Sequence, residues 1–236
     1  MKITGLQKMT LLDFPGRIAC TVFLQGCNFR CPFCHNSDLL GAEVPGEIPV
    51  EELLAFLKKR RGMLDGVCIT GGEPTVQKDL PELLQSIKDL GYPVKLDTNG
   101  TNPAMLKALV ERGLVDYVAM DIKNSRERYG ETAGIPNLSL EKVEESIRFL
   151  LEEKVDYEFR TTLVRQLHEE EDIAAMGRWL VSLCSGKRPK RLFLQNYVDR
   201  ESVLRPGFSA HDRAETEEFR NILAPFCDIV SIRGEG

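Results

Sequence analysis

Three cysteines, Cys27, Cys31 and Cys34, lie within one stretch of eight residues. The apolar run Ile18–Leu24 comes just before them and predicts a strand that presents all three thiolates on one loop. Cysteine thiolates are the usual ligands of iron–sulfur clusters, and a 4Fe–4S cluster takes four ligands. Because this stretch offers three, we expect a cluster with one iron open to a ligand that is not a protein side chain.

A structural zinc site is the alternative explanation of these cysteines. Such a site usually closes with four Cys or His ligands in two pairs. His35 could be the fourth ligand, but it adjoins Cys34 and no second pair follows downstream. The spacing therefore favours an iron–sulfur cluster over zinc, and over a disulfide-linked set.

Composition describes an ordinary globular protein. The chain has 236 residues, 42% of them hydrophobic and 28% charged, which suits one domain spanning residues 1–236. It has no apolar run of about 18 residues and no apolar leader, so we expect a cytoplasmic protein that does not bind membranes. A net charge of −5 disfavours a nucleic-acid surface, and seven cysteines with one tight cluster suit a reducing compartment. We expect a monomer when the protein is alone.

Strand-like and helix-like patterns alternate along the chain. Apolar runs predict six strands, helical spacing of apolar residues predicts the helices between them, and such an alternation favours a parallel sheet in an α/β fold. Residues 1–17 form a polar lead-in that ends in the turn signal Phe14-Pro15-Gly16. The predicted strands are Ile18–Leu24, Gly66–Thr70, Val94–Leu96, Val115–Met120, Tyr157–Leu163 and Arg191–Tyr197; the predicted helices are Val50–Lys59, Leu80–Leu90, Pro103–Val110, Leu140–Leu151, Ile173–Leu183 and Ala214–Leu223, with a last short strand at Asp228–Ile232.

Polar residues follow the predicted strands at the edge where parallel folds place reactive groups. After the second strand, Gly71 and Gly72 would let the backbone approach a ligand closely, and Glu73 could accept hydrogen bonds from an ammonium group. After the third, Asp97-Thr98-Asn99-Gly100 is also a turn signal. After the fourth, Asp121 and Lys123 share one side of the chain and could form a simple ion pair.

The cysteine spacing, with Phe33 before the last cysteine, resembles the signature of the radical S-adenosylmethionine (SAM) superfamily. A wider stretch is similar to the activating enzymes of glycyl radical enzymes, and most of all to anaerobic ribonucleoside-triphosphate reductase activating proteins. That stretch runs from Gly5-Leu6-Gln7-Lys8 through Leu12-Asp13-Phe14-Pro15-Gly16 to Gln25-Gly26-Cys27 and Cys34-His35-Asn36. The superfamily pattern extends from Cys27 to Lys123 and fades after about Arg165.

The resemblance implies a partial (β/α)6 barrel, open at the side, and a 4Fe–4S cluster held by the three cysteines. It also implies a monovalent cation beside the carboxylate of SAM, because two aspartates face that anionic group. The cation ligands would be Asp97, Thr98, Met120 and Asp121, and the SAM contacts would be Phe33, His35, Gly71, Gly72, Glu73, Asp97, Asn99, Asp121, Lys123, Arg160 and Gln195. The lyase activators carry a histidine near position 198, where this chain has Val198, so Gln195 or Asn196 would contact the ribose instead.

The function implied by the resemblance is that of a radical SAM oxidoreductase. It would cleave SAM reductively, with an electron from flavodoxin or ferredoxin, and leave a glycyl radical on a partner enzyme, most readily anaerobic ribonucleoside-triphosphate reductase. Two alternatives remain open: a radical SAM enzyme acting on pyruvate formate-lyase, a small molecule or a peptide, and a non-enzymatic iron–sulfur electron carrier. Gly71–Pro74 argues against the carrier, which has no use for an amino-acid site.

The remaining cysteines and histidines indicate no further chemistry. The cysteines lie on apolar segments and are expected to be buried as small hydrophobic residues, whereas His168 and His211 are expected at the surface. The four cysteines are Cys20, Cys68, Cys184 and Cys227.

Overall fold

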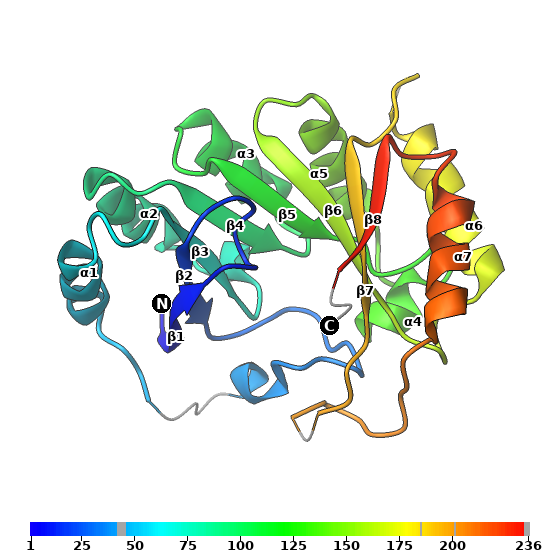
Figure 1. Cartoon of the computed structure of the whole chain (residues 1–236), viewed down its shortest axis with the longest axis horizontal. Coiled ribbons are helices and arrows are strands. Elements are labelled where there is room, and N and C mark those ends of the chain that lie inside the picture. Colours follow the sequence, from blue (N-terminus) through cyan, green and yellow to red (C-terminus); the bar gives the residue numbers. More distant parts are fainter. Residues whose placement is uncertain (42–45, 185, 201, 234–236) are drawn as a thin grey trace. The chain divides into compact units, whose positions relative to one another are not determined.

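Eight strands alternate with helices in the computed structural model, which describes residues 1–41, 46–184, 186–200 and 202–233 (Figure 1). The strands are β1 Ile3–Thr10, β2 Ala19–Leu24, β3 Gly66–Gly71, β4 Val94–Thr98, β5 Tyr117–Asp121, β6 Asp156–Leu163, β7 Arg191–Asn196 and β8 Ile229–Arg233. The helices are α1 Val50–Lys59, α2 Leu80–Asp89, α3 Pro103–Glu111, α4 Tyr129–Ala133, α5 Glu141–Leu151, α6 Glu170–Ser182 and α7 Arg213–Leu223, with short 3-10 turns at Ser37–Leu40 and Pro74–Val76.

The hydrogen-bonded order of the strands follows the sequence from β1 to β8. Pairs β2–β3, β3–β4, β6–β7 and β7–β8 are parallel, and β1 runs antiparallel to β2. Within the described residues the order starts at β1 and ends at β8, so the sheet is not closed into a ring. The predicted α/β class with a mostly parallel sheet is confirmed.

Within the polar lead-in of residues 1–17 the structure has a strand that was not predicted, β1 at Ile3–Thr10. The strand lies at the start of the sheet order, and only its first and last residues are buried. A half-exposed edge strand does not need the apolar run that marks an interior strand of a parallel sheet, which is why its sequence looks polar.

The chain divides into two compact units. The first consists of Met1–Asn28, Asp38–Ala119 and Lys154–Asp156; the second consists of Phe29–Ser37, Met120–Glu153 and Tyr157–Gly236. The chain passes between them inside the cysteine stretch and again inside β5. One domain spanning residues 1–236 stays a prediction.

The helices of the first unit begin and end where their sequence signals predict. Asn102 caps α3, its side chain accepting a hydrogen bond from the backbone N–H of Met105 at 3.3 Å, and Pro103 fills the first helical position. Gly91 and Gly113, just beyond α2 and α3, both have positive φ angles, as expected of residues that stop a helix. Leu53 and Leu57 of α1 are fully buried, in line with the predicted apolar face.

In the second unit, α6 and α7 pack beside each other (Figure 1). Each begins with a reciprocal capping box, Glu169 with Asp172 in α6 and Asp212 with Glu215 in α7. The five-residue helix α4 was not predicted, because it is too short to show a helical period. No helix among the described residues has both the length and the apolar character needed to cross a membrane.

Candidate active site

The cysteine stretch is shared between the two units. Cys27 belongs to the first, and Cys31 and Cys34 belong to the second, where the backbone N–H of Cys34 donates to the carbonyl of Cys31 at 3.1 Å. Cys27 and Cys34 are half-buried and Cys31 is buried, and none of the three is in a disulfide. Burial raises the pKa of the Cys31 thiol, and the positive charge of Lys123 opposes that rise. A cationic group therefore acts on the buried thiol, as a thiolate ligand needs.

This donor set fits a 4Fe–4S cluster. Among the described residues, no three His, Cys, Asp or Glu side chains converge on the position of a single metal ion. A cluster does not require such convergence, because each thiolate binds a different iron atom. Three cysteines on one short loop, none of them in a disulfide and with the charge of Lys123 acting on Cys31, match what three of the four irons need.

In the first unit, two glycines join the end of β3 to the backbone that leads to Cys27. The N–H of Gly72 donates to Leu24 O at 2.9 Å, and the N–H of Glu73 donates to Gly26 O at 2.8 Å. A Cβ on Gly71 would lie 2.3 Å from Leu24 N, and one on Gly72 would lie 1.9 Å from Gly26 O. The glycines were predicted to let backbone approach a ligand; here they let it approach the cysteine loop.

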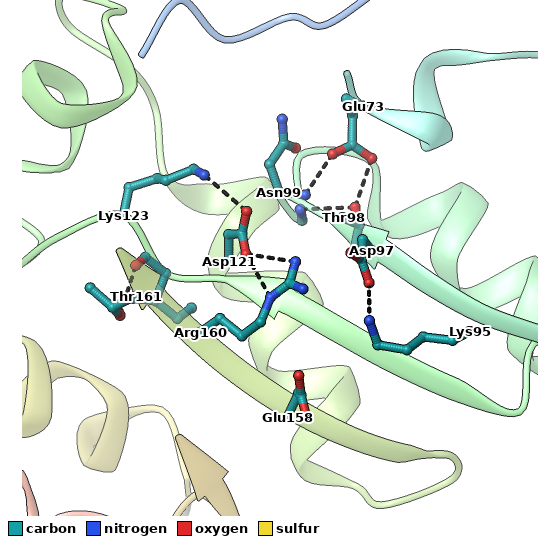
Figure 2. Close-up of polar contacts among 12 residues, drawn as sticks. Glu73, Lys95, Asp97, Thr98, Asn99, Asp121, Lys123, Glu158, Arg160 and Thr161 are labelled. Carbon is teal, nitrogen blue, oxygen red and sulfur yellow. Dashed lines mark hydrogen bonds and ion pairs between the residues drawn. The ribbon is translucent and has the colours of Figure 1, made fainter. Parts of the chain in front are cut away.

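Glu73 is buried and its carboxylate is the centre of a hydrogen-bond network (Figure 2). Oε1 accepts from the N–H and hydroxyl of Thr75 at 3.0 and 2.6 Å and from the Thr98 hydroxyl at 2.7 Å. Oε2 accepts from the N–H of Asn99 at 2.5 Å. Burial raises the pKa of Glu73, and these donors oppose the rise. Glu73 thus ties the end of β3 to the end of β4, a structural role that the sequence did not predict.

Asn99 carries this network on to the cysteine stretch. Its side-chain Nδ2 donates to Asn28 Oδ1 at 2.9 Å and lies 4.0 Å from Sγ of Cys27. Its Oδ1 accepts from the N–H and hydroxyl of Thr101 at 3.1 and 2.7 Å, and that hydroxyl accepts from Nδ2 of Asn28 at 2.7 Å. In this structure Asn99 therefore positions the residues around the first cysteine, a different task from the SAM contact that the resemblance implies.

In the second unit, Asp121 accepts hydrogen bonds from two cationic side chains (Figure 2). Lys123 Nζ lies 3.0 Å from Oδ2, and Nε and Nη2 of Arg160 each lie 3.0 Å from Oδ1. Burial alone would raise the pKa of Asp121, but Lys123 and Arg160 outweigh it and lower the pKa to about 2. The same carboxylate raises the pKa of Lys123, although burial opposes it. The three predicted residues therefore form one charged group.

Asp121→Asn is expected to lower the free energy of unfolding of the metal-free protein by about 2 kcal/mol at pH 7. The folded pKa of Asp121 lies below the unfolded value of about 3.9. Its stabilisation is therefore complete above about pH 5 and is lost as the pH falls through about 2. Urea unfolding at pH 7, 5 and 3 measures the difference. The control Asp228→Asn removes an exposed pair with Arg188 (3.3 Å) and should cost less than about 0.5 kcal/mol. An equal difference at pH 3 and pH 7 would contradict the prediction.

Phe33 and His35, also in the second unit, pack against the segment that follows β7. Phe33 is buried edge-on against Phe208, with ring centroids 6.4 Å apart, and His35 stacks on Tyr197 at 5.3 Å. Nε2 of His35 must carry the hydrogen, because its partner at 2.6 Å is the carbonyl of Val198, which can only accept. Val198, which stands where the lyase activators have a histidine, thus binds a histidine from the cysteine stretch.

Gln195 and Asn196, the two candidates for a ribose contact, lie at the end of β7. Asn196 Oδ1 accepts a hydrogen bond from the Thr216 hydroxyl of α7 at 3.0 Å. Because this contact holds Asn196 against α7, Gln195 is the better of the two candidates for a ligand contact.

The cation implied by the resemblance fits this chain poorly. Asp97 Oδ1 lies 2.5 Å from Nζ of Lys95, a buried lysine that the sequence pattern did not single out (Figure 2). The Thr98 hydroxyl donates to Glu73, and Asp121 is held by two cations. Both carboxylates therefore already have cationic side chains as partners.

The prediction that His168 and His211 lie at the surface is wrong, because both are buried. Nδ1 of His168 accepts from the N–H of Val164 at 3.1 Å, so Nε2 carries the hydrogen and donates to the carbonyl of Lys123 at 2.9 Å. Burial lowers the pKa of His168, which keeps the ring neutral. His168 thereby holds the backbone of the lysine implied as a SAM contact. The prediction that the four scattered cysteines are buried is confirmed.

Tyr129 is a second residue that the sequence pattern did not reveal. It is fully buried, its hydroxyl donates to the carbonyl of Asp121 at 3.2 Å, and its ring packs edge-on against Phe29 of the cysteine stretch. Just after α4, a Cβ on Gly134 would lie 2.0 Å from Arg30 O. The unpredicted helix therefore supports the loop that carries Cys31.

Comparison with known proteins agrees with this geometry. The family model of the radical SAM superfamily matches residues 21–178. The chain is 36% identical over 183 residues to "Putative glycyl-radical enzyme activating enzyme MJ1227" of Methanocaldococcus jannaschii, covering 75% of this chain and 74% of that one. It is 34% identical over 128 residues to the pyruvate formate-lyase-activating enzyme of Clostridium pasteurianum, covering 52% of each chain.

One further relative and one solved structure are also similar to the chain. The 7-carboxy-7-deazaguanine synthase of Thermoplasma acidophilum is 28% identical over 155 residues, covering 65% of this chain and 70% of that one. The solved structure of a radical SAM methyltransferase from Sphaerobacter thermophilus superposes with a TM-score of 0.71 at 15% identity, covering 96% of this chain and 69% of that one, which shows a shared fold. The chain belongs to the radical SAM superfamily of enzymes, which implies a 4Fe–4S cluster and SAM, and its relatives include activating enzymes of glycyl radical enzymes.

Proposed function

We propose that this protein is a radical SAM activase that generates a glycyl radical on a partner enzyme, with anaerobic ribonucleoside-triphosphate reductase as the first candidate partner. The observation that carries this proposal is the similarity to glycyl-radical enzyme activating enzymes over most of the chain. The site geometry supports it, because the segments implied to bind the cluster and SAM are fixed to one another within each unit.

The proposed roles follow from the contacts described above. Cys27, Cys31 and Cys34 would hold the cluster. Glu73 keeps at most limited capacity for the amino group of SAM, because its carboxylate accepts hydrogen bonds from Thr75, Thr98 and Asn99. The backbone carbonyls of the adjacent glycines are therefore the better acceptors for that ammonium group.

At the other end of the amino acid, the carboxylate of SAM would bind Lys123 and Arg160, the two cationic side chains that contact Asp121. Phe33 would lie against the adenine, the main chain of His35 would contact its edge, and Gln195 would contact the ribose. The cluster held by Cys27, Cys31 and Cys34 would, when bound and reduced, supply the electron for the reductive cleavage of SAM, and the radical formed would take a hydrogen atom from the partner's glycine. The protein contributes position, charge and exclusion of water.

The proposal includes flavodoxin or ferredoxin as the electron donor, since the cleavage consumes one electron. It also includes a cytoplasmic protein, monomeric when alone and built as a single radical SAM domain over residues 1–236, that binds neither nucleic acid nor membranes.

Electron paramagnetic resonance tests the proposal. The anaerobically reconstituted protein, SAM and a reductant are mixed with anaerobic ribonucleoside-triphosphate reductase, and a doublet typical of a glycyl radical is expected. A reductase with alanine at the radical glycine should give no doublet, and pyruvate formate-lyase serves as the competing partner. SAM cleavage without a doublet on either enzyme would contradict the activase function.

A radical SAM enzyme that acts on a small molecule is the second candidate, favoured by the similarity to 7-carboxy-7-deazaguanine synthase. It predicts that 5′-deoxyadenosine forms in step with a small product when the protein is given a cell extract freed of macromolecules. In the activase function, that release requires the partner protein.

A further inference from the structure

The segment that carries Cys31 and Cys34 has no regular secondary structure. Residues 31–36 form neither helix nor strand, and inside them the N–H of Cys34 donates to Cys31 O at 3.1 Å. The polar groups of an irregular segment need partners from elsewhere, and fixing its backbone in one conformation costs entropy that those contacts must offset. The shape of this loop therefore depends on the part of the chain that packs against it.

In the second unit, the connection between β7 and α7 supplies such partners. Its residues 202–209, which we call the strap, lie against the loop. The Ser202 hydroxyl donates to His35 O at 2.9 Å, and the N–H of Arg205 donates to Pro32 O at 2.9 Å. Both acceptors are backbone carbonyls of the loop, one on each side of Cys34. The strap therefore fixes the backbone on both sides of that cysteine.

Two further contacts join the strap to the loop. The hydroxyl of Ser37 donates to the carbonyl of Ser202. The ring of Phe208 lies edge-on against Phe33 and against Tyr197, with centroids 6.4 and 6.5 Å apart. Phe33 is buried, so the position of its ring depends on the rings that surround it. The strap thus contacts the side chain that stands between the last two cysteines as well as the backbone around them.

The far end of the strap is fixed to the turn that follows β6. The N–H of Arg165 donates to Ser209 O at 3.0 Å, and the N–H of Ser209 donates to Oε1 of Gln166 at 3.0 Å. Nε of Arg165 donates to Ala210 O at 3.2 Å, and its guanidinium group pairs with Glu215 of α7. The strap is therefore attached to regular structure of its own unit and can hold the loop in place.

A fixed loop matters because metal binding is coupled to folding. A loop that becomes ordered only when the metal binds weakens binding by the free energy of ordering, whereas a preformed loop does not. Contacts that fix the loop in the absence of a cluster therefore favour both the assembly and the retention of one. The same contacts fix the ring of Phe33, which is implied to lie against the adenine of SAM.

We propose that the strap holds the cysteine loop in its cluster-binding shape before a cluster is present, with Ser202 and Phe208 as positioning residues. Ser202 acts through the carbonyl of His35, and Phe208 acts through the ring of Phe33. The inference rests on the proposed function, because it takes the cysteines of the loop as cluster ligands.

Hydrogen exchange of the cluster-free protein, read by mass spectrometry, tests the shape of the loop. The amide hydrogens of Cys34 and Arg205 report on it, because they donate to Cys31 O and Pro32 O. Ser202→Ala removes one hydrogen bond between strap and loop, so both amides should exchange about fivefold faster. Ser202→Thr keeps the hydroxyl and should restore the slow exchange.

Release of iron from the reconstituted protein to a chelator, without air, tests the consequence for the cluster. Ser202→Ala and Phe208→Leu should each release iron about fivefold faster than the natural protein, and the double variant at least tenfold faster. Ser209→Ala is the matched control. It removes a hydrogen bond from Nε2 of Gln166 at the far end of the strap (2.9 Å), so it should affect urea unfolding alone and leave iron release unchanged.

The two measurements separate a positioning role from a loss of overall stability. Iron release or amide exchange of Ser202→Ala that matches Ser209→Ala, at equal stability to urea, would overturn the role of the strap. So would a Ser202→Thr protein that behaves like Ser202→Ala. A natural protein that assembles no cluster would instead overturn the proposed function, and exchange of the cluster-free protein would still decide whether the strap shapes the loop.

Discussion

Replacing Cys31 with alanine is expected to abolish both assembly of the cluster and cleavage of SAM. The chain offers three thiols in its cysteine stretch, so the substitution leaves two ligands for a cluster that needs three from the protein. Cys31 is also the buried thiol on which the charge of Lys123 acts. Iron and sulfide content after anaerobic reconstitution should fall to the level of a sample without protein, and no 5′-deoxyadenosine should form.

Cys184→Ala is the matched control, because it removes a buried thiol outside the site. Its Sγ donates to Leu180 O at 2.9 Å on α6, so the cost should fall on folding stability and not on iron content. A Cys31→Ala protein that retains a full cluster and cleaves SAM would refute the assignment of the ligands.

The parallel part of the fold could be predicted from the sequence because interior strands are buried on both faces. Such strands read as continuous apolar runs, and the run predicted at Ile18–Leu24 lies within one residue of β2. β1 carries no such run, since most of its residues are at least partly exposed. The five residues of α4 span little more than one helical turn, too short for a period to appear.

The sequence predicted which residues lie at the site better than it predicted which side chains they contact. Strand ends placed Glu73, Asn99 and Asp121 at one edge of the sheet, because each follows a recognisable strand. Their partners lie far away in the sequence: Glu73 binds the end of the next strand, and Asp121 binds Arg160. The pattern of one strand carries no information about which side chain of another strand will meet it.

Lys95 is a residue whose burial could not be predicted from the sequence pattern. A lysine in a strand normally indicates a face exposed to solvent, because charged residues are seldom fully buried. Lys95 is buried since Asp97, two residues on, lies on the same face and balances its charge. The pair could be read from spacing alone, but its burial depends on packing that only the structure shows. The same applies to His168, whose ring contacts a backbone carbonyl 45 residues away.

Gly72→Ala is expected to lower the free energy of unfolding by about 3 kcal/mol and to reduce iron retention sharply. The backbone of Gly72 is not in the left-handed region, so an alanine there suffers from lack of space alone. Its Cβ would lie 1.9 Å from Gly26 O and 3.1 Å from Cys27 N. Relieving this overlap must move the backbone next to the first cluster ligand and break the hydrogen bond from the N–H of Glu73 to Gly26 O.

Gly113→Ala is the control variant, because it adds backbone strain without steric overlap. Gly113 has a φ of +67° and nothing within 4 Å of the place that a Cβ would take, so alanine there should cost about 1 kcal/mol and leave the cluster intact. Urea unfolding of the cluster-free proteins and iron content after reconstitution measure the two effects. Because the overlap at Gly72 lies beside Cys27, loss of iron should exceed what the loss of stability alone explains. Equal iron content in the two variants would show that the approach of β3 to the cysteine loop is not what positions Cys27.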